Sequence, residues 1–141
     1  MMNLEALKGE LARDEGVELR MYLDTSTPPN HTIGVGHNLD AVPISYEAAM
    51  QILEDDILAV MGELNLRLPW WNTLDDVRQR VLANMCFNLG IEDLMLFTTF
   101  LPLMEKGDYG AAADDLANTK IAKDEPKRIA RLISMIRTGT V

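Results

Sequence analysis

The sequence predicts a mostly helical α+β fold in which a small antiparallel β-hairpin lobe is joined to a helical lobe. Two short β-leaning segments, 19–24 and 31–36, flank the turn-rich stretch TSTPPN and indicate the hairpin. Apolar residues at helical spacing dominate the rest of the chain. A chain of 141 residues without an internal repeat fits one domain, here with a hairpin lobe at about 16–60 and a helical lobe at about 61–141 that also includes the N-terminal helix.

The first two helices are the most clearly marked. One is expected at about 3–13, because three leucines recur there at helical spacing and Gly16 interrupts the pattern. A second helix, of about 20 residues, is expected to begin at the N-cap Ser45 and to end before Pro69. It is long enough to connect the two lobes. Its apolar face comprises Ala49, Ile52, Leu53, Ile57, Val60, Met61 and Leu64.

Further helices are expected in the second half of the chain. Thr73 is the expected N-cap of a third helix, which has Asp76 in its first turn and should end at Gly90. The last helix should begin at 124–126, where Asp-Glu precedes a proline, a residue well tolerated at the first helical position. Shorter helices are expected at 92–97, 99–106 and 109–118.

The composition is that of an ordinary globular protein, with 48% hydrophobic residues and a mean hydropathy of −0.03. No apolar run reaches about 18 residues, and charge is mixed into every turn of the N-terminal segment. We therefore expect neither a transmembrane helix nor a secretory signal. The lone Cys86 excludes an internal disulfide and, with only two histidines in the chain, leaves no zinc ligand set. We expect no metal and no other cofactor.

The net charge of −9 argues against nucleic acid as a partner. The charge is unevenly distributed, since residues 1–119 contain 7 basic and 20 acidic side chains, whereas 120–141 contain 6 basic and 2 acidic ones. The C-terminal segment can therefore present a local positive potential that the net charge hides.

Three polar residues are placed where the predicted elements can converge on one cleft. Glu15 lies where the first helix ends, Asp24 where the first strand ends, and Thr32 on the returning strand. Two carboxyl groups in different surroundings can act as acid and base, as in glycoside hydrolysis. With 22 acidic residues in the chain, however, a capping glutamate and a turn aspartate explain this spacing more simply. The spacing alone does not decide between them.

Several ordered motifs are more specific than any carboxylate pair. They are DEG at 14–16, the Glu-x8-Asp spacing from Glu15 to Asp24, TIGVGH at 32–37, VRQRVLANMCFNLG at 77–90, PKRIARL at 126–132 and RTGT at 137–140. In these motifs, from about Asn3 to Thr140, the chain resembles the phage-type lysozymes of glycoside hydrolase family 24. The resemblance implies a lysozyme-like fold.

The resemblance also implies catalytic roles. Glu15 matches the general acid that protonates the leaving glycosidic oxygen, and Asp24 matches the carboxylate that, with Thr32, holds and activates the attacking water. A water between carboxylate and sugar implies inversion at the anomeric carbon. Arg128 matches an arginine that faces the catalytic acid.

Other positions match supporting and substrate-binding residues of the family. Arg131 matches an arginine that pairs with the position of Asp14, and His37 matches a structural histidine whose partner is best placed here at Asp56. The family's sugar-contacting positions are occupied by Asn38, Phe87, Phe100 and Asp115. Phe87 fits equally well as a core residue. Trp70 and Trp71, which follow a helix-stopping proline, are expected to pack rather than to stack on sugars.

Two local departures from the family affect the expected site. Asp24 and Thr32 are separated by seven residues, two more than the family's common spacing, so the hairpin tip should be longer while the strands still pair. The segment 38–45 is much shorter than in the T-even phage member of the family, so part of the glycan-binding lobe is trimmed. None of the expected catalytic positions is lost.

The implied activity is that of a muramidase, which hydrolyses the β-1,4 bond between N-acetylmuramic acid and N-acetylglucosamine in bacterial peptidoglycan. The family implies a monomeric phage or prophage endolysin that does not insert into the membrane. It would stay in the host cytoplasm until lysis and reach the wall through a lesion such as a holin makes. The alternatives are a catalytically impaired lysozyme-like module that binds glycan or protein, and an acidic helical adaptor. Retention of Glu15, Asp24, Thr32 and Arg128 favours the enzyme.

Overall fold

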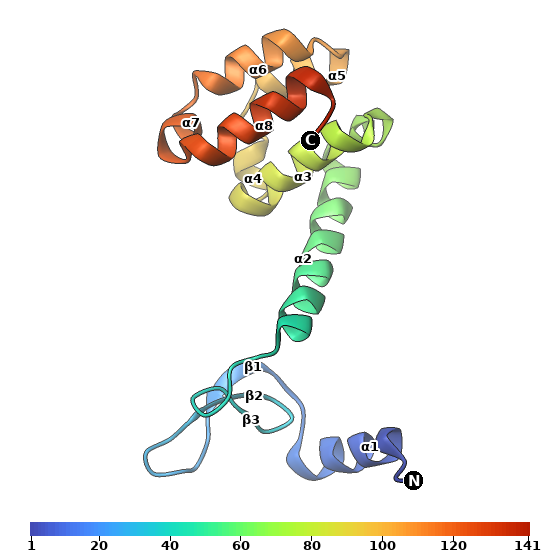
Figure 1. The fold of residues 1–141 in the computed structure, drawn as a ribbon, viewed down its shortest axis with the longest axis vertical. Helices are drawn as coiled ribbons and strands as arrows, with labels where there is room; N and C mark the ends of the chain where they lie inside the picture. Colours follow the sequence, from blue (N-terminus) through green and yellow to red (C-terminus); the bar gives the residue numbers. More distant parts are fainter. The chain divides into compact units, whose positions relative to one another are not determined.

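A computed structural model describes all residues from Met1 to Val141. The chain divides into two compact units, Met1–Gln51 and Ile52–Val141, each with its own secondary structure. Helix α2 (Tyr46–Arg67) begins in the first unit and continues into the second (Figure 1). The N-terminal helix belongs to the first unit in this division. The lobe boundaries expected from the sequence stay predictions.

The first unit opens with α1 (Leu4–Glu15), which confirms the first expected helix. The side chain of Asn3 caps it, since its Oδ1 accepts a hydrogen bond from the amide of Ala6 at 3.0 Å. The helix ends where Gly16 takes a φ of +77°, a conformation that favours glycine. Glu15 is therefore the last residue of the helix.

The first unit also contains a three-stranded antiparallel sheet in the order β1-β2-β3 (Figure 1). β1 (Glu18–Leu23) and β2 (His31–Gly34) confirm the expected hairpin. β3 (His37–Asn38) was not expected, because two residues are too few to show a strand period. It pairs with β2 because Gly34 and Gly36 take positive φ angles and turn the chain back.

Helix α2 begins where the sequence predicted. The Oγ of Ser45 accepts a hydrogen bond from the amide of Ala48 at 3.0 Å, which confirms the expected N-cap. The helix ends before Pro69, which starts the 3-10 helix η1 (Pro69–Thr73). Trp70 and Trp71 of this turn pack against the hydrophobic core, as expected, and Trp71 is 5% exposed.

The N-cap of α3 (Asp76–Leu89) is Asp75 and not Thr73. Thr73 lies in the 3-10 turn, where its Oγ1 donates a hydrogen bond to the carbonyl of Trp70 at 2.6 Å. The Oδ1 of Asp75 instead accepts a hydrogen bond from the amide of Arg78 at 3.0 Å. The expected Thr73 cap was therefore wrong, because a local turn contact already uses the threonine hydroxyl.

Five helices complete the second unit. They are α4 (Ile91–Leu94), α5 (Phe100–Lys106), α6 (Tyr109–Ala117), α7 (Lys120–Asp124) and α8 (Pro126–Thr138). The three short helices expected between residues 92 and 118 are confirmed with small shifts in their bounds, and α8 begins at its proline as predicted. Helix α7 was missed, because five residues give too little periodicity to recognise.

The hydrophobic core lies in the second unit, and every helix from α2 to α8 contributes buried side chains to it. The largest fully buried residues include Phe100, Leu64, Leu82, Met85 and Met104. Helix α8 turns an apolar stripe towards the core, since Ile129, Leu132 and Ile136 are buried and Ile133 packs against the core. No helix combines the length and the hydrophobicity that a membrane span requires.

Arg78 ties α3 to α8. Its Nε and Nη2 donate to the carbonyl of Ile136 at 2.9 and 2.7 Å, and its guanidinium carbon lies 3.7 Å from the centre of the Tyr109 ring. These contacts satisfy a carbonyl at the C-terminal end of α8 that has no partner within the helix. They help to fix α8, which contains the expected site residues Arg128 and Arg131, against α3.

Candidate active site

Glu15, the expected catalytic acid, ends α1, and its side chain is exposed. Its carboxylate lies beside the turn between β2 and β3, because a Cβ atom built on Gly36 would sit 3.6 Å from Glu15 Oε2. Gly36 has a φ of +65°, which favours glycine. Gly36 therefore keeps the turn close to the carboxylate without covering it. This role was not expected from the sequence, although Gly36 belongs to the TIGVGH motif.

Asp24, the expected second carboxylate, closes the tip of the hairpin. Its Oδ1 accepts hydrogen bonds from the amides of Ser26 and Asn30 at 3.0 and 2.8 Å, and its Oδ2 accepts one from Asn30 Nδ2 at 3.2 Å. The amide of Asp24 in turn donates to the carbonyl of Asn30 at 3.0 Å. The tip thus holds its extra residues while Leu23 still pairs with His31. The strands therefore pair on either side of the tip, as expected.

These hydrogen bonds lower the pKa of the Asp24 carboxyl below its ordinary value. The backbone N–H of Asn30 is the largest cause of the lowered pKa. Desolvation opposes it, and the side chain of Asn30 and the contacts with Ser26 lower the pKa further. Hydrogen bonds donated to a carboxylate favour its ionised form. Asp24 is therefore suited to act as a base or to hold a water, and not as a proton donor.

Asn30→Ala is expected to raise the pKa of Asp24, because the side-chain donor is lost while the backbone donor remains. If catalysis needs ionised Asp24, the acidic limb of the pH–activity profile moves to higher pH. The lowered pKa also stabilises the folded protein at pH values above the pKa that Asp24 has in the unfolded chain. This stabilisation is lost as the pH falls through the pKa that Asp24 has in the folded protein, which is higher in the variant, so the variant loses it at a higher pH than the wild type. Profiles on purified peptidoglycan measure the shift, with Thr25→Ala at the same tip as control. An unmoved limb in a folded variant contradicts the role of Asp24.

Thr32 is the buried polar residue of the first unit, 3% exposed, and it pairs with Tyr22 on β1 and Asn38 on β3. Its Oγ1 donates a hydrogen bond to the carbonyl of Asn30 at 3.0 Å. Asn30 thereby connects Thr32 to Asp24. Thr32 helps to position the residue that holds the carboxylate. The sequence placed Asn30 only in a turn and gave no further signal of this role.

The histidines of the first unit make local hydrogen bonds. His37 Nε2 lies 2.9 Å from the carbonyl oxygen of Val42. His31, for which no role was expected, has its Nδ1 3.1 Å from Asp40 Oδ2, and its amide donates to the same carboxylate at 2.7 Å. This amide and then the imidazole lower the pKa of Asp40. The histidine–aspartate pair within this unit is therefore His31–Asp40, while His37–Asp56 stays a prediction.

Asn38, an expected sugar contact, stabilises the loop that follows β3. Its Oδ1 accepts hydrogen bonds from the amides of Asp40 and Ala41 at 3.0 and 3.1 Å. The loop occupies the oxygen, so the amide nitrogen Nδ2 is the group that can reach a sugar hydroxyl.

In the second unit, Arg128 is held by α3. Its Nε donates to Asn84 Oδ1 at 2.9 Å, and its Nη1 lies 3.7 Å from Glu125 Oε2. The same Glu125 oxygen accepts a hydrogen bond from Asn88 Nδ2 at 3.0 Å. Asn84, Asn88, Glu125 and Arg128 therefore form a polar row between α3 and the start of α8. Neither asparagine was expected as a site residue, because nothing local distinguishes it from a solvated helix position.

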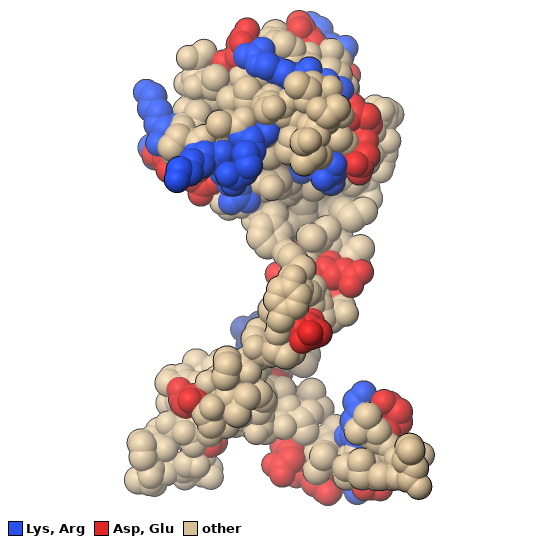
Figure 2. All heavy atoms as spheres, in the orientation of Figure 1, with Lys and Arg blue, Asp and Glu red and all other residues tan.

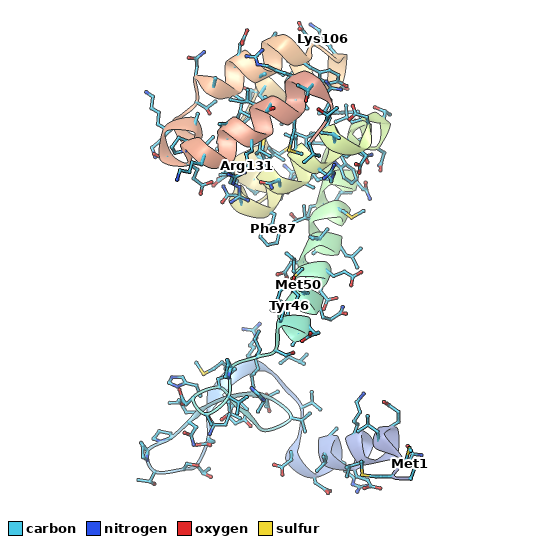
Figure 3. All side chains as sticks on the ribbon, in the orientation of Figure 1. Met1, Tyr46, Met50, Phe87, Lys106 and Arg131 are labelled. Carbon is cyan, nitrogen blue, oxygen red and sulfur yellow. The ribbon has the colours of Figure 1, made fainter.

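Two pockets adjoin the polar row. One, of about 460 Å³, is lined mainly by apolar side chains of α2 and α3 and includes Phe87 and Arg128. Phe87 is 46% exposed and projects from α3 (Figure 3), so it is not a core residue. The other, of about 710 Å³, contains Asp115 together with Asn88 and Glu125. Two of the expected substrate-binding residues, Phe87 and Asp115, thus line pockets that a ligand can enter.

Phe100 requires a correction. It is 0% exposed at the start of α5, and its ring meets that of Phe97 edge-on with centroids 6.3 Å apart. The expectation that it contacts sugar was wrong, because the side chain has no surface to offer a ligand. Burying a large aromatic ring is strongly favourable, which explains why the side chain turns into the core.

Three expected contacts each join a residue of the first unit to one of the second. They are Glu15 with Arg128, Asp14 with Arg131, and His37 with Asp56, and they stay predictions. Within its own unit, Asp14 Oδ1 lies 3.4 Å from Arg13 Nε. No group of three or more His, Cys, Asp or Glu side chains is placed to hold a metal ion. The first unit therefore contains two carboxyl groups in different surroundings, the exposed Glu15 and the hydrogen-bonded Asp24.

Comparison with known proteins covers nearly the whole chain. The phage lysozyme family model matches residues 12–134. The chain is 30% identical to probable T4-type lysozyme 2 of Dictyostelium discoideum and 27% identical to probable T4-type lysozyme 1 of that organism, each over 98% of this chain and 97% of the relative. It is also 26% identical to the pre-baseplate central spike protein Gp5 of Enterobacteria phage T4, over 93% of this chain and 27% of that protein.

Proposed function

Because the chain belongs to the phage lysozyme family, we propose that it is a muramidase that hydrolyses the β-1,4 bond between N-acetylmuramic acid and N-acetylglucosamine in peptidoglycan. The observation that carries the proposal is the difference between the two carboxyl groups of the first unit. Asp24 accepts three hydrogen bonds, whereas Glu15 accepts none. Acid and base catalysis by a pair of carboxyl groups depends on such a difference.

In the proposed reaction, protonated Glu15 donates its proton to the glycosidic oxygen as the bond from that oxygen to C1 of N-acetylmuramic acid breaks. Asp24 takes a proton from a water whose oxygen attacks C1 from the opposite face. The new hydroxyl stays on N-acetylmuramic acid, and O4 of N-acetylglucosamine keeps the proton from Glu15. Exchange with solvent restores both carboxyl groups. Direct attack by water inverts the configuration at C1.

The remaining residues serve this reaction in the proposal. Thr32 positions Asn30 and, because its hydroxyl hydrogen is already donated, can accept a hydrogen bond from the attacking water. Arg128, fixed by the polar row, orients Glu15. The glycan is contacted by Asn38, Phe87 and Asp115, and the pairs Asp14–Arg131 and His37–Asp56 support the site.

We also propose that the enzyme is a monomeric endolysin that accumulates in the host cytoplasm and causes host lysis. It would reach the wall after a holin or a similar agent opens the membrane. These statements rest on membership of the phage lysozyme family.

The stereochemistry of the product tests the mechanism. Hydrolysis of purified glycan strands is expected to release N-acetylmuramic acid at the new reducing ends, with the α-anomer appearing first from the β-linked strand. Proton NMR read before mutarotation separates the anomers. Initial β-product would show that Asp24 attacks the sugar directly and would leave the muramidase activity intact. Strands that bind without being cleaved would show that the chain is a glycan-binding module instead.

A further inference from the structure

Lysine and arginine side chains gather on one face of the second unit, over α7 and the first half of α8 (Figure 2). We define the basic face as Lys123 and Lys127, both of which are exposed. Eight of the thirteen Lys and Arg residues of the chain form ion pairs. The two lysines of the basic face form none, so their charges are available to a partner.

Helix α8 differs in charge from the rest of the molecule. It contains Lys127, Arg128, Arg131 and Arg137 and no acidic residue, whereas each of the other α-helices contains at least one. Arg128 and Arg137 pair with carboxylates of neighbouring segments. A positive surface is therefore present at the basic face of a chain whose net charge is −9.

The position of Lys127 is unfavourable for folding. It is the second residue of α8, where the positive end of the helix macrodipole repels a cation. Arg128, the next residue, has Glu125 as a partner, but Lys127 has no carboxylate partner. The stability of the helix gives no reason for a lysine at this position, whereas an anionic ligand does.

We propose that the basic face binds the carboxylates of the peptidoglycan peptides and anchors the enzyme to the wall through residues of the second unit that take no part in the proposed reaction. The identity of the partner rests on the proposed function. Peptidoglycan contains many peptide carboxylates in one continuous network, so two of them can bind the two lysines at the same time. The acidic remainder of the molecule is repelled by the same network, and the bound enzyme turns α8 towards the wall.

The test compares two double variants, each of which removes two positive charges and so changes the net charge by the same amount. Lys123→Gln with Lys127→Gln removes two cations of the basic face. Arg20→Gln with Lys106→Gln removes two cations elsewhere that also lack ion pairs; Lys106 ends α5 (Figure 3). Both are made in the full chain with Glu15→Gln, so that the wall is not digested during the measurement.

Binding is measured by sedimentation with purified sacculi free of attached phosphate polymers, at about 10 mM salt, where charges act over about 30 Å. The basic-face variant is expected to bind about five- to tenfold more weakly, given the strength of two exposed ion pairs. The control variant is expected to change binding less than about twofold. Equal losses in both variants, or no loss in the first, would overturn the proposal, because net charge or another surface would then govern capture.

Two further measurements complete the test. Amidating the wall carboxylates is expected to abolish the difference between the two variants, and an undiminished difference would show that the basic face binds another group. Hydrolysis of a short neutral oligosaccharide, measured with Glu15 restored, is expected to be the same in both variants. If neither variant hydrolyses the oligosaccharide while their difference in wall binding persists, the proposed function is wrong and the proposed role of the basic face is retained. If both variants hydrolyse it and bind the wall equally, the proposed function is retained and the role of the basic face is wrong.

Discussion

Glu15→Gln is expected to lower the rate of peptidoglycan hydrolysis by at least about two orders of magnitude, since general acid catalysis typically contributes 10²–10⁴-fold. The amide has nearly the shape of the acid but has no proton to donate to the leaving oxygen. Glu15 is exposed and accepts no hydrogen bond, so the substitution leaves no buried partner unsatisfied. The unfolding midpoint should therefore stay within measurement error of the wild type.

Glu10→Gln is the matched control, because Glu10 is another exposed glutamate of the same helix and its substitution removes the same charge. It is expected to leave the rate within about twofold of the wild type. Initial rates on purified peptidoglycan and a denaturant melt of each variant provide both readouts. Substantial turnover by folded Glu15→Gln protein would exclude Glu15 as the proton donor and require another acid in the site.

Phe100→Ala is expected to lower the free energy of unfolding by about 3–5 kcal/mol, which is typical of removing a buried aromatic ring. The ring is fully buried and packs against Phe97, so its removal leaves a cavity in the core. Denaturant unfolding measures the change. Phe100→Leu, which keeps much of the volume, is expected to lose less and to remain folded if the alanine variant does not.

Phe87 provides the opposite case. The ring is exposed beside the polar row, so Phe87→Ala is expected to change the free energy of unfolding by no more than about 1 kcal/mol. If Phe87 contacts the glycan, the variant has a raised KM for glycan strands, whereas Phe100→Leu leaves KM near the wild-type value. A raised KM in Phe100→Leu with an unchanged one in Phe87→Ala would reverse the assignment of the two residues.

The longer elements could be predicted because their signals are local. The leucine spacing of α1, the Ser45 cap of α2 and the proline that opens α8 each depend on residues within a few positions of one another. Helical periodicity and capping need no distant partner. Short elements lack this signal, which is why β3 and α7 were missed. The cap of α3 was placed at Thr73 instead of Asp75 because the 3-10 turn before the helix uses the threonine hydroxyl.

The sequence by itself determined the family and the chemical groups of the site, because Glu15, Asp24 and Thr32 stand in ordered motifs that can be recognised without coordinates. Only the tertiary structure decided how those groups are held. The backbone and side-chain amides of Asn30 donate hydrogen bonds to the Asp24 carboxylate, and Gly36 lies beside the carboxylate of Glu15. In the other unit, Asn84 fixes Arg128 across 44 positions of sequence. The direction of the Phe100 ring was likewise settled by packing. Composition and spacing describe what a segment can do alone, whereas burial and the pairing of a donor with an acceptor depend on which distant segment the fold brings beside it.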